Sequence, residues 1–436
     1  MSQDKKRNLK IRLEHVTRVE GHGNIVMDVK NGKILSVQWQ VSEAPRFFEM
    51  MMVGRYYHEL SHIASRICGI CSIAHALASL KAVENALNVE ISNQTMLLRK
   101  LAKNAENIQS HILHVGYLVA PDLFGVGSIF PLIKTHKDAV LQIIEIHRLS
   151  NELSDLICGR TTHPITMVVG GFTKIPTEKE LAKFKSRLYR AKDTIRNIAD
   201  IVLSNIDKLP NFSRETEYIG LISKDEYALY DGVIGSTDTG EHKIEDYASI
   251  TQEFVVPHST AKHARHNRSS YMVGALARFN LNSSKLLPLG QEIADKFDLK
   301  APCFNPFMNN VAQLVEIAHC IEDSIHIIDK LLDTGLKEEE KVEVEVKAGR
   351  GIGVVEAPRG LLIHDYTIDD NGKCVKANCV VPTNQNHENI QKDLEAFAPT
   401  LLDKSKEEIE HNLEMLVRAY DPCISCSTHY LKVRFV

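Results

Sequence analysis

Apolar and polar residues alternate over much of the first forty positions, a period of two that is typical of strands with one buried face. The alternation is clearest over residues 24–30 and 33–41. Between these runs, Asn31-Gly32 is a dipeptide that favours the positive φ angles of a tight hairpin turn. The pattern therefore predicts a β-hairpin near the N-terminus.

From Ala44 onward the apolar residues recur at steps of three and four, as they do on one face of a helix. One run begins with a capping box, Thr177-x-x-Glu180. Two runs end at a proline, which lacks the backbone N–H that a helix interior needs. The predicted helices are about 73–87, 97–119 (ended by Pro121), 178–206 (ended by Pro210), 307–332 and 404–419. Long amphipathic helices joined by loops are typical of a helix bundle.

Strand patterning returns in the last hundred residues. We expect the acidic segment 337–341 to be a solvated connection. The alternation at Val342, Val344 and Val346 predicts a strand after it, and further strands are predicted at 351–364 and, beyond an Asn371-Gly372 turn, at 374–381. The expected fold class is α+β, mainly α, with a long-helix bundle core and small β-rich segments near the N-terminus and before the C-terminus.

The composition is that of a globular protein and excludes several classes. The 436 residues are 44% hydrophobic, and 52 Lys and Arg against 56 Asp and Glu leave a net charge of −4. A chain this apolar buries a core, and it lacks the basic excess by which proteins bind nucleic acid. No apolar run reaches the roughly 18 residues of a membrane-spanning helix, and MSQDKKRNLK lacks the apolar centre of a signal peptide. Nine cysteines, an odd number, do not suggest a secreted disulfide framework, so we expect a cytoplasmic location.

Two Cys-x-x-Cys pairs are the strongest chemical signal in the sequence. Each has a histidine close behind it: Cys68 and Cys71 with His75, and Cys423 and Cys426 with His429. Two such pairs supply four soft ligands for one metal site. A structural zinc site is one interpretation, but zinc ribbons place their pairs roughly 15–20 residues apart, whereas 352 positions (423 − 71) separate these. A thioredoxin-like redox pair is less favoured, since neither pair lies in a βαβ pattern. The spacing suits a cofactor buried at the centre of a large protein.

These pairs resemble those of the large, catalytic subunit of [NiFe]-hydrogenases. Further stretches agree with that family in order: 17–22 (TRVEGH), 159–164 (GRTTHP) with Gly170-Gly171, 356–360 (EAPRG) and 381–386 (VPTNQN). The resemblance implies one domain over residues 1–436, with a β-rich segment at about 1–43, a helix bundle at 44–335, a β-rich segment at 342–400, and a C-terminal helix and metal-binding loop at 401–436. The sequences PTNQN and SCSTH resemble the cytosolic, multi-subunit branch that is linked to NAD(P), ferredoxin or deazaflavin.

The resemblance implies a nickel–iron centre. Nickel would be bound by Cys68, Cys71, Cys423 and Cys426, and Cys71 and Cys426 would also bridge to an iron that carries one CO and two cyanide ligands. Such a centre splits H2 reversibly and heterolytically into protons and electrons. Thiolates suit this chemistry because they are electron-rich and stabilise higher oxidation states of nickel.

Several residues would surround that centre. Arg359 would lie above it, where its permanent charge can contact a cyanide or assist H2 cleavage, and Asp122 and Asp421 would hold the Arg359 side chain. The Thr383 hydroxyl would donate to the second cyanide. The residues expected to contact the cofactor in this way are Pro358, Arg359, Pro382 and Thr383.

Two further residues would act through the cysteines. His75 would donate a hydrogen bond to a bridging sulfur and tune the metal. Glu20 would be the proton gate, a carboxylate beside Cys423 that passes H⁺ outward.

The resemblance also implies a second metal site near the C-terminus. Mg²⁺ or Fe²⁺ would be bound by Glu49, the backbone carbonyl of Cys379 and His429. The remaining cysteines are expected to be small buried residues: Cys158, Cys303, Cys320, Cys374 and the Cys379 side chain. Four histidines are expected to be packed or interfacial, namely His58, His62, His111 and His114, with His111 alone a candidate for a proton or electron route.

The chain needs partners to carry electrons away. Its other cysteines show no iron–sulfur spacing, so the resemblance implies an iron–sulfur small subunit, with flavin-containing diaphorase and ferredoxin-like subunits beyond it. Without a G-x-G-x-x-G motif, NAD(P) would bind a partner. The alternatives are a hydrogen sensor, which would keep the cysteine pairs, the quinone-module subunit of respiratory complex I, which lacks them, and a structural zinc protein. The seven residues after His429 resemble a tail that family precursors lose on maturation.

Overall fold

The computed structural model describes residues 8–340 and 342–429. The predictions about the N-terminal heptapeptide, about Lys341 in the acidic connection and about the tail after His429 lie outside the described residues.

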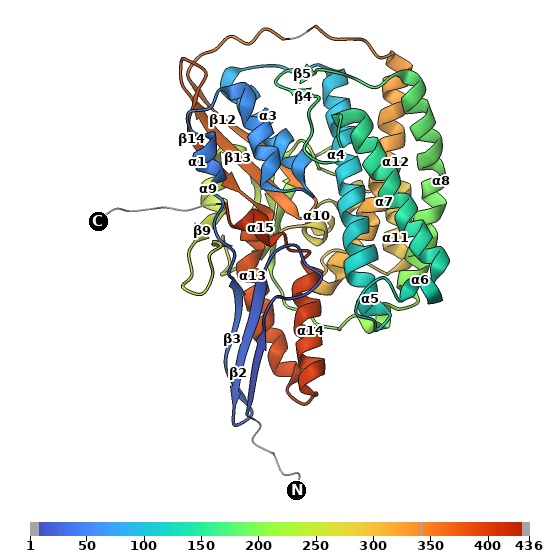
Figure 1. The fold of residues 1–436 in the computed structure, drawn as a ribbon, viewed down its shortest axis with the longest axis vertical. Helices are drawn as coiled ribbons and strands as arrows, with labels where there is room; N and C mark the ends of the chain where they lie inside the picture. Colours follow the sequence, from blue (N-terminus) through green and yellow to red (C-terminus); the bar gives the residue numbers. More distant parts are fainter. Residues whose placement is uncertain (1–7, 341, 430–436) are drawn as a thin grey trace, which may run out of the picture.

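The described helices and strands are labelled as in Figure 1. The α-helices are α1 (Phe48–Met52), α2 (Leu60–Ala64), α3 (Ser72–Leu87), α4 (Asn93–Leu113), α5 (Ala120–Leu123), α6 (Leu132–Thr135), α7 (Lys137–Cys158), α8 (Glu178–Leu203), α9 (Tyr247–Ile250), α10 (Ala275–Asn282), α11 (Pro288–Lys296), α12 (Asn309–Thr334), α13 (Pro382–Phe397), α14 (Lys406–Ala419) and α15 (Ile424–Ser427). The strands are β1 (Leu9–Leu13), β2 (Gly23–Lys30), β3 (Lys33–Val41), β4 (Met167–Val168), β5 (Gly171–Phe172), β6 (Glu217–Ile222), β7 (Val233–Ser236), β8 (Gly240–His242), β9 (Gln252–Phe254), β10 (His263–Arg265), β11 (Tyr271–Met272), β12 (Gly349–Ala357), β13 (Gly360–Ile368) and β14 (Cys374–Val380). The short 3-10 helices are η1 (Tyr57–Glu59), η2 (Ser65–Ile67), η4 (Ile206–Lys208), η5 (Ile244–Asp246), η6 (Ser283–Lys285), η7 (Pro306–Met308) and η8 (Ala398–Leu401), and η3 (His114–Val119) is a π-helical turn.

The predicted fold class, α+β and mainly α, is confirmed. Helices α4, α7, α8 and α12 pack along one another as the bundle (Figure 1). The predicted capping box is present, because the Thr177 hydroxyl accepts from the Glu180 backbone N–H while the Glu180 carboxylate accepts from the Thr177 N–H. The predicted hairpin is β2–β3, with positive φ angles at Asn31 and Gly32.

Two of the longer helices, α7 and α13, were missing from the prediction, as were shorter ones such as α10 and α11, and one predicted helix end was wrong. Helix α7 carries apolar residues at the expected steps and was overlooked. Helix α13 has no apolar stripe in its first turns, because residues 383–387 are polar side chains buried in hydrogen bonds. Pro121 does not end the second helix: the chain continues through η3 into α5, and Pro121 lies in the first turn of α5, where a missing N–H is tolerated.

The strand predictions also need correction. The alternation at 342–346 is not a strand, since residues 342–348 have no ladder in the structure. The run 351–364 is divided into β12 and β13, an antiparallel pair in which Ala357 faces Gly360, so that Pro358 and Arg359 form the turn. The range expected to be a helix bundle, 44–335, also contains strands β4 to β11.

Helix α3 packs directly on strand β12, with no side chain between the two backbones. Gly349, Gly351 and Gly353 recur every second residue on the strand, and they face the backbone of Ala86, Ala82 and Ala78, which recur every fourth residue on the helix. The two spacings match, since four helical residues rise about 6 Å and two strand residues about 6.6 Å. Because Cys71 precedes α3 and Arg359 follows β12, this contact fixes the two residues relative to one another.

We expect Gly351→Ala to lower the melting temperature of the protein by roughly 1–3 °C. A Cβ at position 351 would collide with the carbonyl oxygen of Ala82, and overpacking of this kind costs about 1–3 kcal/mol. Gly127→Ala is the matched control, because a Cβ there meets open space. Thermal unfolding followed by circular dichroism measures both, and equal melting temperatures for the two variants would contradict the close contact.

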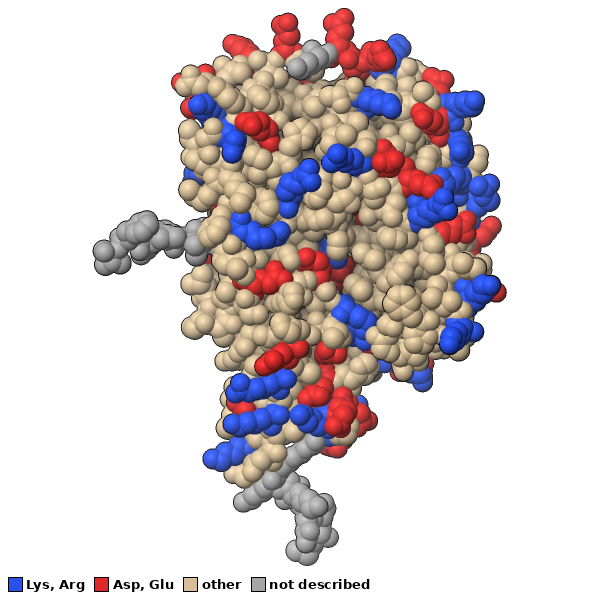
Figure 2. Space-filling model, viewed as in Figure 1, with Lys and Arg blue, Asp and Glu red and all other residues tan. Residues whose placement is uncertain are grey.

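The surface is mixed in charge. On the face in Figure 2, Lys and Arg side chains are interspersed with Asp and Glu. Among the described residues, no helix is long and apolar enough to cross a membrane.

Candidate metal centre

The two cysteine pairs, far apart in sequence, meet at the centre of the molecule. Cys68 follows η2 and Cys71 is the N-cap residue of α3, while Cys423 is the N-cap residue of α15 and Cys426 lies inside it. Figure 1 shows α15 between α13 and the sheet β12–β14. All four cysteines are buried, the most exposed being Cys68 at 5%.

The sulfur atoms converge closely enough to share a metal site. Cys68 Sγ lies 3.5 Å from Cys423 Sγ, and Cys71 Sγ lies 3.9 Å from Cys426 Sγ. Cys423 Sγ and Cys426 Sγ are 3.0 Å apart. Two thiolates that each bind one metal at about 2.3 Å lie roughly 3–4 Å apart, so the donor set fits a thiolate-bound metal. The expected bridging pair, Cys71 and Cys426, lie next to one another, as a shared second metal requires.

Protons and metal would compete for these sulfur atoms. Hydrogen bonds with the other three thiols lower the pKa of Cys68 well below its ordinary value. Hydrogen bonding to the neighbouring thiols, together with burial, raises the pKa of Cys426 well above its ordinary value. A metal that binds this cluster therefore displaces protons from it.

Glu20 holds the C-terminal cysteine loop through both its backbone and its side chain. Its backbone pairs with Cys423 and accepts from the Ile424 N–H at 2.9 Å. Its carboxylate oxygen Oε2 lies 3.1 Å from Cys423 Sγ and accepts from the Ser425 N–H at 3.0 Å. The loop can approach because residue 21 is glycine, with φ at +88° and no room for a Cβ beside Ile424. The predicted contact between Glu20 and Cys423 is present.

Thr383 lies beside the same loop. Its hydroxyl oxygen accepts from the Cys423 backbone N–H at 3.0 Å, which leaves the hydroxyl proton free for a ligand of the metal. Pro382 is in the first turn of α13 and directs that helix start at the cysteines.

Arg359 reaches the site from the β12–β13 turn. Its Nε donates to the backbone oxygen of Asp421 at 2.6 Å and a terminal nitrogen donates to Asp421 Oδ1 at 2.8 Å. The other terminal nitrogen donates to Ser110 Oγ at 3.3 Å. Burial alone would lower the pKa of Arg359, but Asp421 and the cysteines raise it well above its ordinary value, so the guanidinium stays charged. The carbonyl of Pro358 accepts from Arg278, which fixes the turn.

Asp122 was expected to hold the Arg359 side chain, but in the structure it does not pair with Arg359. The Asp122 carboxylate is bound by the guanidinium groups of Arg18 and Arg418 instead. Asp421 alone of the two predicted aspartates pairs with Arg359. Several arginines lie within reach of this region in the fold, and the sequence does not show which of them each carboxylate binds.

His75 is placed as expected, with an additional partner. Its Nε2 lies 4.0 Å from Cys426 Sγ, and its Nδ1 lies 3.1 Å from Nε2 of His364 on β13. Burial lowers the pKa of His75 to about 4, so the ring is neutral at physiological pH. His364 in turn contacts the hydroxyl of Tyr366, at 2.5 Å.

The residues of the expected second metal site also meet. His429 Nε2 lies 2.7 Å from the Cys379 carbonyl oxygen and 3.6 Å from Glu49 Oε1. Glu49 Oε1 accepts from the Cys379 N–H at 2.8 Å. Burial raises the pKa of the Glu49 carboxyl. A carboxylate, a carbonyl and an imidazole in contact form a donor set that fits a divalent cation.

Four residues that support the site were not identified from the sequence. Glu106 is fully buried on α4 and accepts from the N–H groups of Ile73 and Ala74, so it caps the helix that starts at Cys71. Arg46 donates to the carbonyls of Ile67 and Ser425 and so joins the two cysteine loops. Ser110 and His364 were likewise unmarked. Of these residues, only Glu106 could have been recognised from the sequence, because it is a charged residue on the apolar face of a predicted helix.

The other histidines and cysteines follow the expectation only in part. Cys158, Cys320, Cys374 and Cys379 are buried, as expected, whereas Cys303 is partly exposed. His111 and His114 are packed, whereas His58 and His62 are not, and an interfacial role for these two stays a prediction. His111 is buried and binds Glu316 at 2.8 Å, and His114 is buried one turn later. His58 and His62 are exposed. Among the described residues, no cysteine sulfur outside the two Cys-x-x-Cys pairs belongs to a group of side chains that could hold a metal.

Comparison with known proteins agrees with this arrangement. The family model "Nickel-dependent hydrogenase" matches residues 46–139 and 224–429, and the model "HoxL-like" matches residues 10–44. Sulfhydrogenase 2 subunit alpha of Pyrococcus furiosus is 33% identical over 424 residues, which cover 97% of this chain and 100% of that protein. The NAD-reducing hydrogenase HoxS subunit beta of Cupriavidus necator is 28% identical and covers 97% and 95% of the two chains.

A solved structure matches the whole fold. It is the crystal structure of an NAD⁺-reducing [NiFe]-hydrogenase in the H2-reduced state, with 26% identity and a TM-score of 0.87 over 97% of this chain and 99% of that one. The four converging cysteines and these matches together give the identification: the chain belongs to the nickel-dependent hydrogenase family, as a catalytic subunit of a [NiFe]-hydrogenase.

Proposed function

We propose that this chain performs the reaction H2 ⇌ 2H⁺ + 2e⁻ with the residue roles expected from its motifs. The observation that carries the proposal is the convergence of four buried thiols beneath a buried, charged guanidinium. A nickel–iron centre held by Cys68, Cys71, Cys423 and Cys426 would supply the redox chemistry for H2 cleavage. The protein contributes a fixed positive charge from Arg359, oriented by Asp421, close to where negative charge develops.

Protons leave through Glu20 in this proposal. Glu20 Oε2 is in contact with Cys423 Sγ, and Glu20 itself is only half-buried, so it connects the buried sulfur to the surface. Beyond it, Glu43 Oε1 lies 3.5 Å from Ser425 Oγ and 3.1 Å from Nδ1 of the exposed His22. These groups offer acceptors along a short path to solvent.

We expect Glu20→Gln to lower H2 oxidation about 10²-fold while nickel and iron stay bound. The amide keeps the size of the side chain and can still accept from the Ser425 N–H, but it cannot carry a proton. Glu14→Gln, at an exposed position, is the control. Turnover and H/D exchange with water should fall together, and near-normal exchange in Glu20→Gln would show that protons take another path.

Electrons leave, we propose, across the surface outside the first cysteine pair. Cys68 is buried, but its neighbours Arg66 and Gly69 are exposed. The adjoining segment exposes large apolar side chains by 40–65%: Phe47, Met50, Met51, Val53 and Tyr56. Contiguous exposed apolar residues mark protein interfaces, and this one adjoins the metal ligands.

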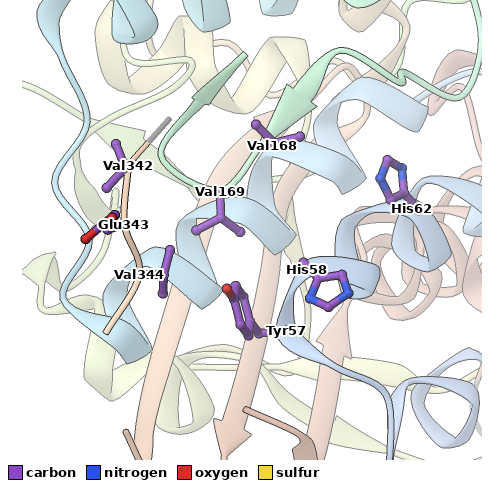
Figure 3. Close-up of a pocket in the computed structure, with 8 residues that line it drawn as sticks. All are labelled: Tyr57, His58, His62, Val168, Val169, Val342, Glu343 and Val344. Carbon is purple, nitrogen blue, oxygen red and sulfur yellow. The ribbon is translucent and has the colours of Figure 1, made fainter. Parts of the chain in front are cut away.

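This surface is also hollowed. A cavity of about 810 Å³ opens beside it, lined by Tyr57, His58, His62, Val168, Val169 and residues 342–344, and Figure 3 shows these side chains around it. A second hollow of about 510 Å³ is lined by Phe48, Met51, His58, Glu59, His62, Ile63 and Arg66. We propose that the iron–sulfur small subunit docks here. The names of the relatives, subunits alpha and beta of larger hydrogenases, support a multi-subunit assembly.

Beyond the small subunit we propose flavin-containing and ferredoxin-like subunits, with a soluble acceptor such as NAD(P) or ferredoxin. The NAD-reducing relative and the NAD⁺-reducing structure support this choice. Mg²⁺ or Fe²⁺ between Glu49, Cys379 and His429 is proposed as well. The cytoplasmic location stays a prediction.

Metal analysis, infrared spectroscopy and a turnover assay test the proposed function on the purified complex. We expect nickel and iron, infrared bands of CO and cyanide, one further divalent cation, and H2-dependent reduction of an artificial electron acceptor. Zinc without nickel would support a structural metal site instead. The nickel–iron centre with its infrared bands but without turnover would identify a hydrogen sensor.

A further inference from the structure

We propose that helix α10 positions Arg359, chiefly through Arg278, which holds the backbone of the turn that carries Arg359. Arg278 is fully buried, and it donates to the backbone oxygens of Ala357 at 3.0 Å and Pro358 at 2.9 Å. These two residues precede Arg359, at the point where the β12–β13 ladder ends with the pair of Ala357 and Gly360. Buried carbonyl oxygens at the end of a ladder need a donor from elsewhere in the chain, and Arg278 supplies it to both. The effect of Arg278 on turnover rests on the proposed role of Arg359.

Every donor of the Arg278 guanidinium is used. A guanidinium carries five N–H groups. Nε donates to Glu316 Oε1 at 2.7 Å, and one terminal nitrogen donates to Glu316 Oε2 at 2.6 Å, which makes a two-point contact. The other terminal nitrogen donates to Glu356 Oε2 at 2.8 Å. Together with the two backbone oxygens of the turn, these contacts give all five N–H groups an acceptor, so the side chain is fixed in one orientation.

The two carboxylates are themselves held by other elements of the fold. Glu316 lies on α12, and its Oε2 is 2.8 Å from His111 Nε2 on α4. Glu356 Oε1 accepts from the Leu221 N–H of β6 at 2.6 Å, and both carboxylates are fully buried. Burial alone would raise the pKa of Glu316, but the charge of Arg278 lowers it well below its ordinary value, so the ion pair is kept. Arg278 therefore fixes the turn relative to α4, α12 and β6.

The same helix is also tied to the carboxylate partner of Arg359. A backbone N–H in the first turn of α10 donates to Asn309 Oδ1 at 2.9 Å. Asn309 Nδ2 in turn donates to the backbone oxygen of Ala419 at 2.8 Å, two residues before Asp421. Through Arg278 on one side and Asn309 on the other, α10 therefore holds both members of the Arg359–Asp421 ion pair.

Arg278→Lys tests the positioning role in the purified holoenzyme. Lysine keeps the charge, but its three N–H donors lie on one atom, so it cannot hold both carboxylates and both backbone oxygens. We expect the variant to keep nickel and iron and to shift the cyanide infrared bands. It should lose roughly tenfold in kcat with little change in KM for H2, because a misplacement of about 1 Å can cost up to roughly 10²-fold. Unchanged bands and rate would overturn the proposal.

Arg99→Lys is the matched control for the loss of a buried arginine. Arg99 is also fully buried, makes a two-point contact with the carboxylate of Glu84, and donates to the backbone oxygen of Val168. Glu84 lies 13 residues beyond Cys71 along α3 (84 − 71 = 13), which corresponds to about 20 Å of helix. Arg99→Lys should lower the melting temperature but leave the infrared bands and kcat unchanged. Equal band shifts in both variants would overturn the proposal, since any buried arginine would then have this effect.

Two further measurements separate this proposal from the proposed role of Arg359. In the Arg359→Lys background, the rate loss caused by Arg278→Lys should disappear, because Arg278 acts only through Arg359, and a fully additive loss would overturn the proposal. In crystal structures of Arg278→Lys and Arg99→Lys, the contact between Arg359 Nε and the Asp421 backbone oxygen, 2.6 Å here, should lengthen only in the former. If Arg359→Lys were fully active, the role of Arg359 in turnover would fail, whereas a lengthened contact would still establish that Arg278 positions it. An unchanged contact would overturn the proposal.

Should Arg278→Lys fail to accumulate, Asn309→Asp tests the same helix. A carboxylate at this position can still accept from the backbone N–H of α10, but it cannot donate to the Ala419 oxygen. The variant should keep nickel and iron, shift the cyanide bands and lower kcat. Unchanged bands and rate in Asn309→Asp would overturn the positioning role of α10.

Discussion

Replacing Cys71 by serine is expected to leave the protein without its nickel–iron centre and without H2 turnover. Cys71 Sγ lies 3.9 Å from Cys426 Sγ, so in the proposed centre both metals depend on this sulfur. A serine hydroxyl is a harder ligand than a thiolate and is not deprotonated at neutral pH, so it binds nickel poorly. Metal analysis should find little nickel, and the CO and cyanide bands should be absent.

The matched control is Cys303→Ser, a cysteine that lies outside the cluster and is partly exposed. It should keep both metals and full turnover. The melting temperature of Cys71→Ser, compared with that of the metal-free wild type, separates loss of a ligand from loss of the fold. Full metal content in Cys71→Ser would refute the proposed ligand set.

Arg359→Lys is expected to keep nickel and the cyanide bands and yet to lose on the order of 10²- to 10³-fold in rate, a range typical of lost electrostatic or acid–base assistance. The arginine uses all three nitrogens, donating to the Asp421 backbone, the Asp421 carboxylate and Ser110 Oγ. Lysine keeps the charge but not the planar fork, so it cannot make these contacts together.

Arg350→Lys is the control for the general effect of replacing an arginine by a lysine. Arg350 lies on the same sheet and also forms a two-point contact with a carboxylate, that of Asp365, but 55% of its side chain is exposed and it is remote from the cysteines in the chain. It should have little effect on turnover. Wild-type turnover in Arg359→Lys would mean that charge alone suffices, and absence of metal would make Arg359 an assembly residue.

The sequence contained enough information for the main helices and for the ligand set. The period of three and four identifies α3, α4, α8, α12 and α14, because apolar residues recur at these steps along each of them. The partners of each cysteine pair and of Glu49, which lie far away in the sequence, could be assigned only through the resemblance to the hydrogenase family. Nothing in their local sequence says that residues 68 and 423 meet.

Three of the misses, namely helix α13, the partners of Asp122 and the contact of His364, share a physical cause. Helix α13 buries polar side chains that hydrogen-bond to other segments, and no periodicity records such bonds. Asp122 binds Arg18 and Arg418, a choice made by the packing of three distant segments. His364 joins His75 only because β13 lies against α3. Contacts that the tertiary fold creates leave little trace in a single sequence.

The separation of the two cysteine pairs in the sequence also sets a minimum time between their synthesis on the ribosome. At a synthesis rate of about 5–20 residues per second, roughly 20–70 s pass on the ribosome between Cys71 and Cys423. During that interval the thiols of Cys68 and Cys71 lack the segment that later covers them. This segment contains helix α15 and the loop at Ile424 that pairs with Glu20. A metal delivered then would find half a site, open to water and to oxidation. Loading of the complete centre therefore has to wait until the segment that carries Cys423 and Cys426 has been synthesised, so this second cysteine pair sets the earliest time at which an active enzyme can form.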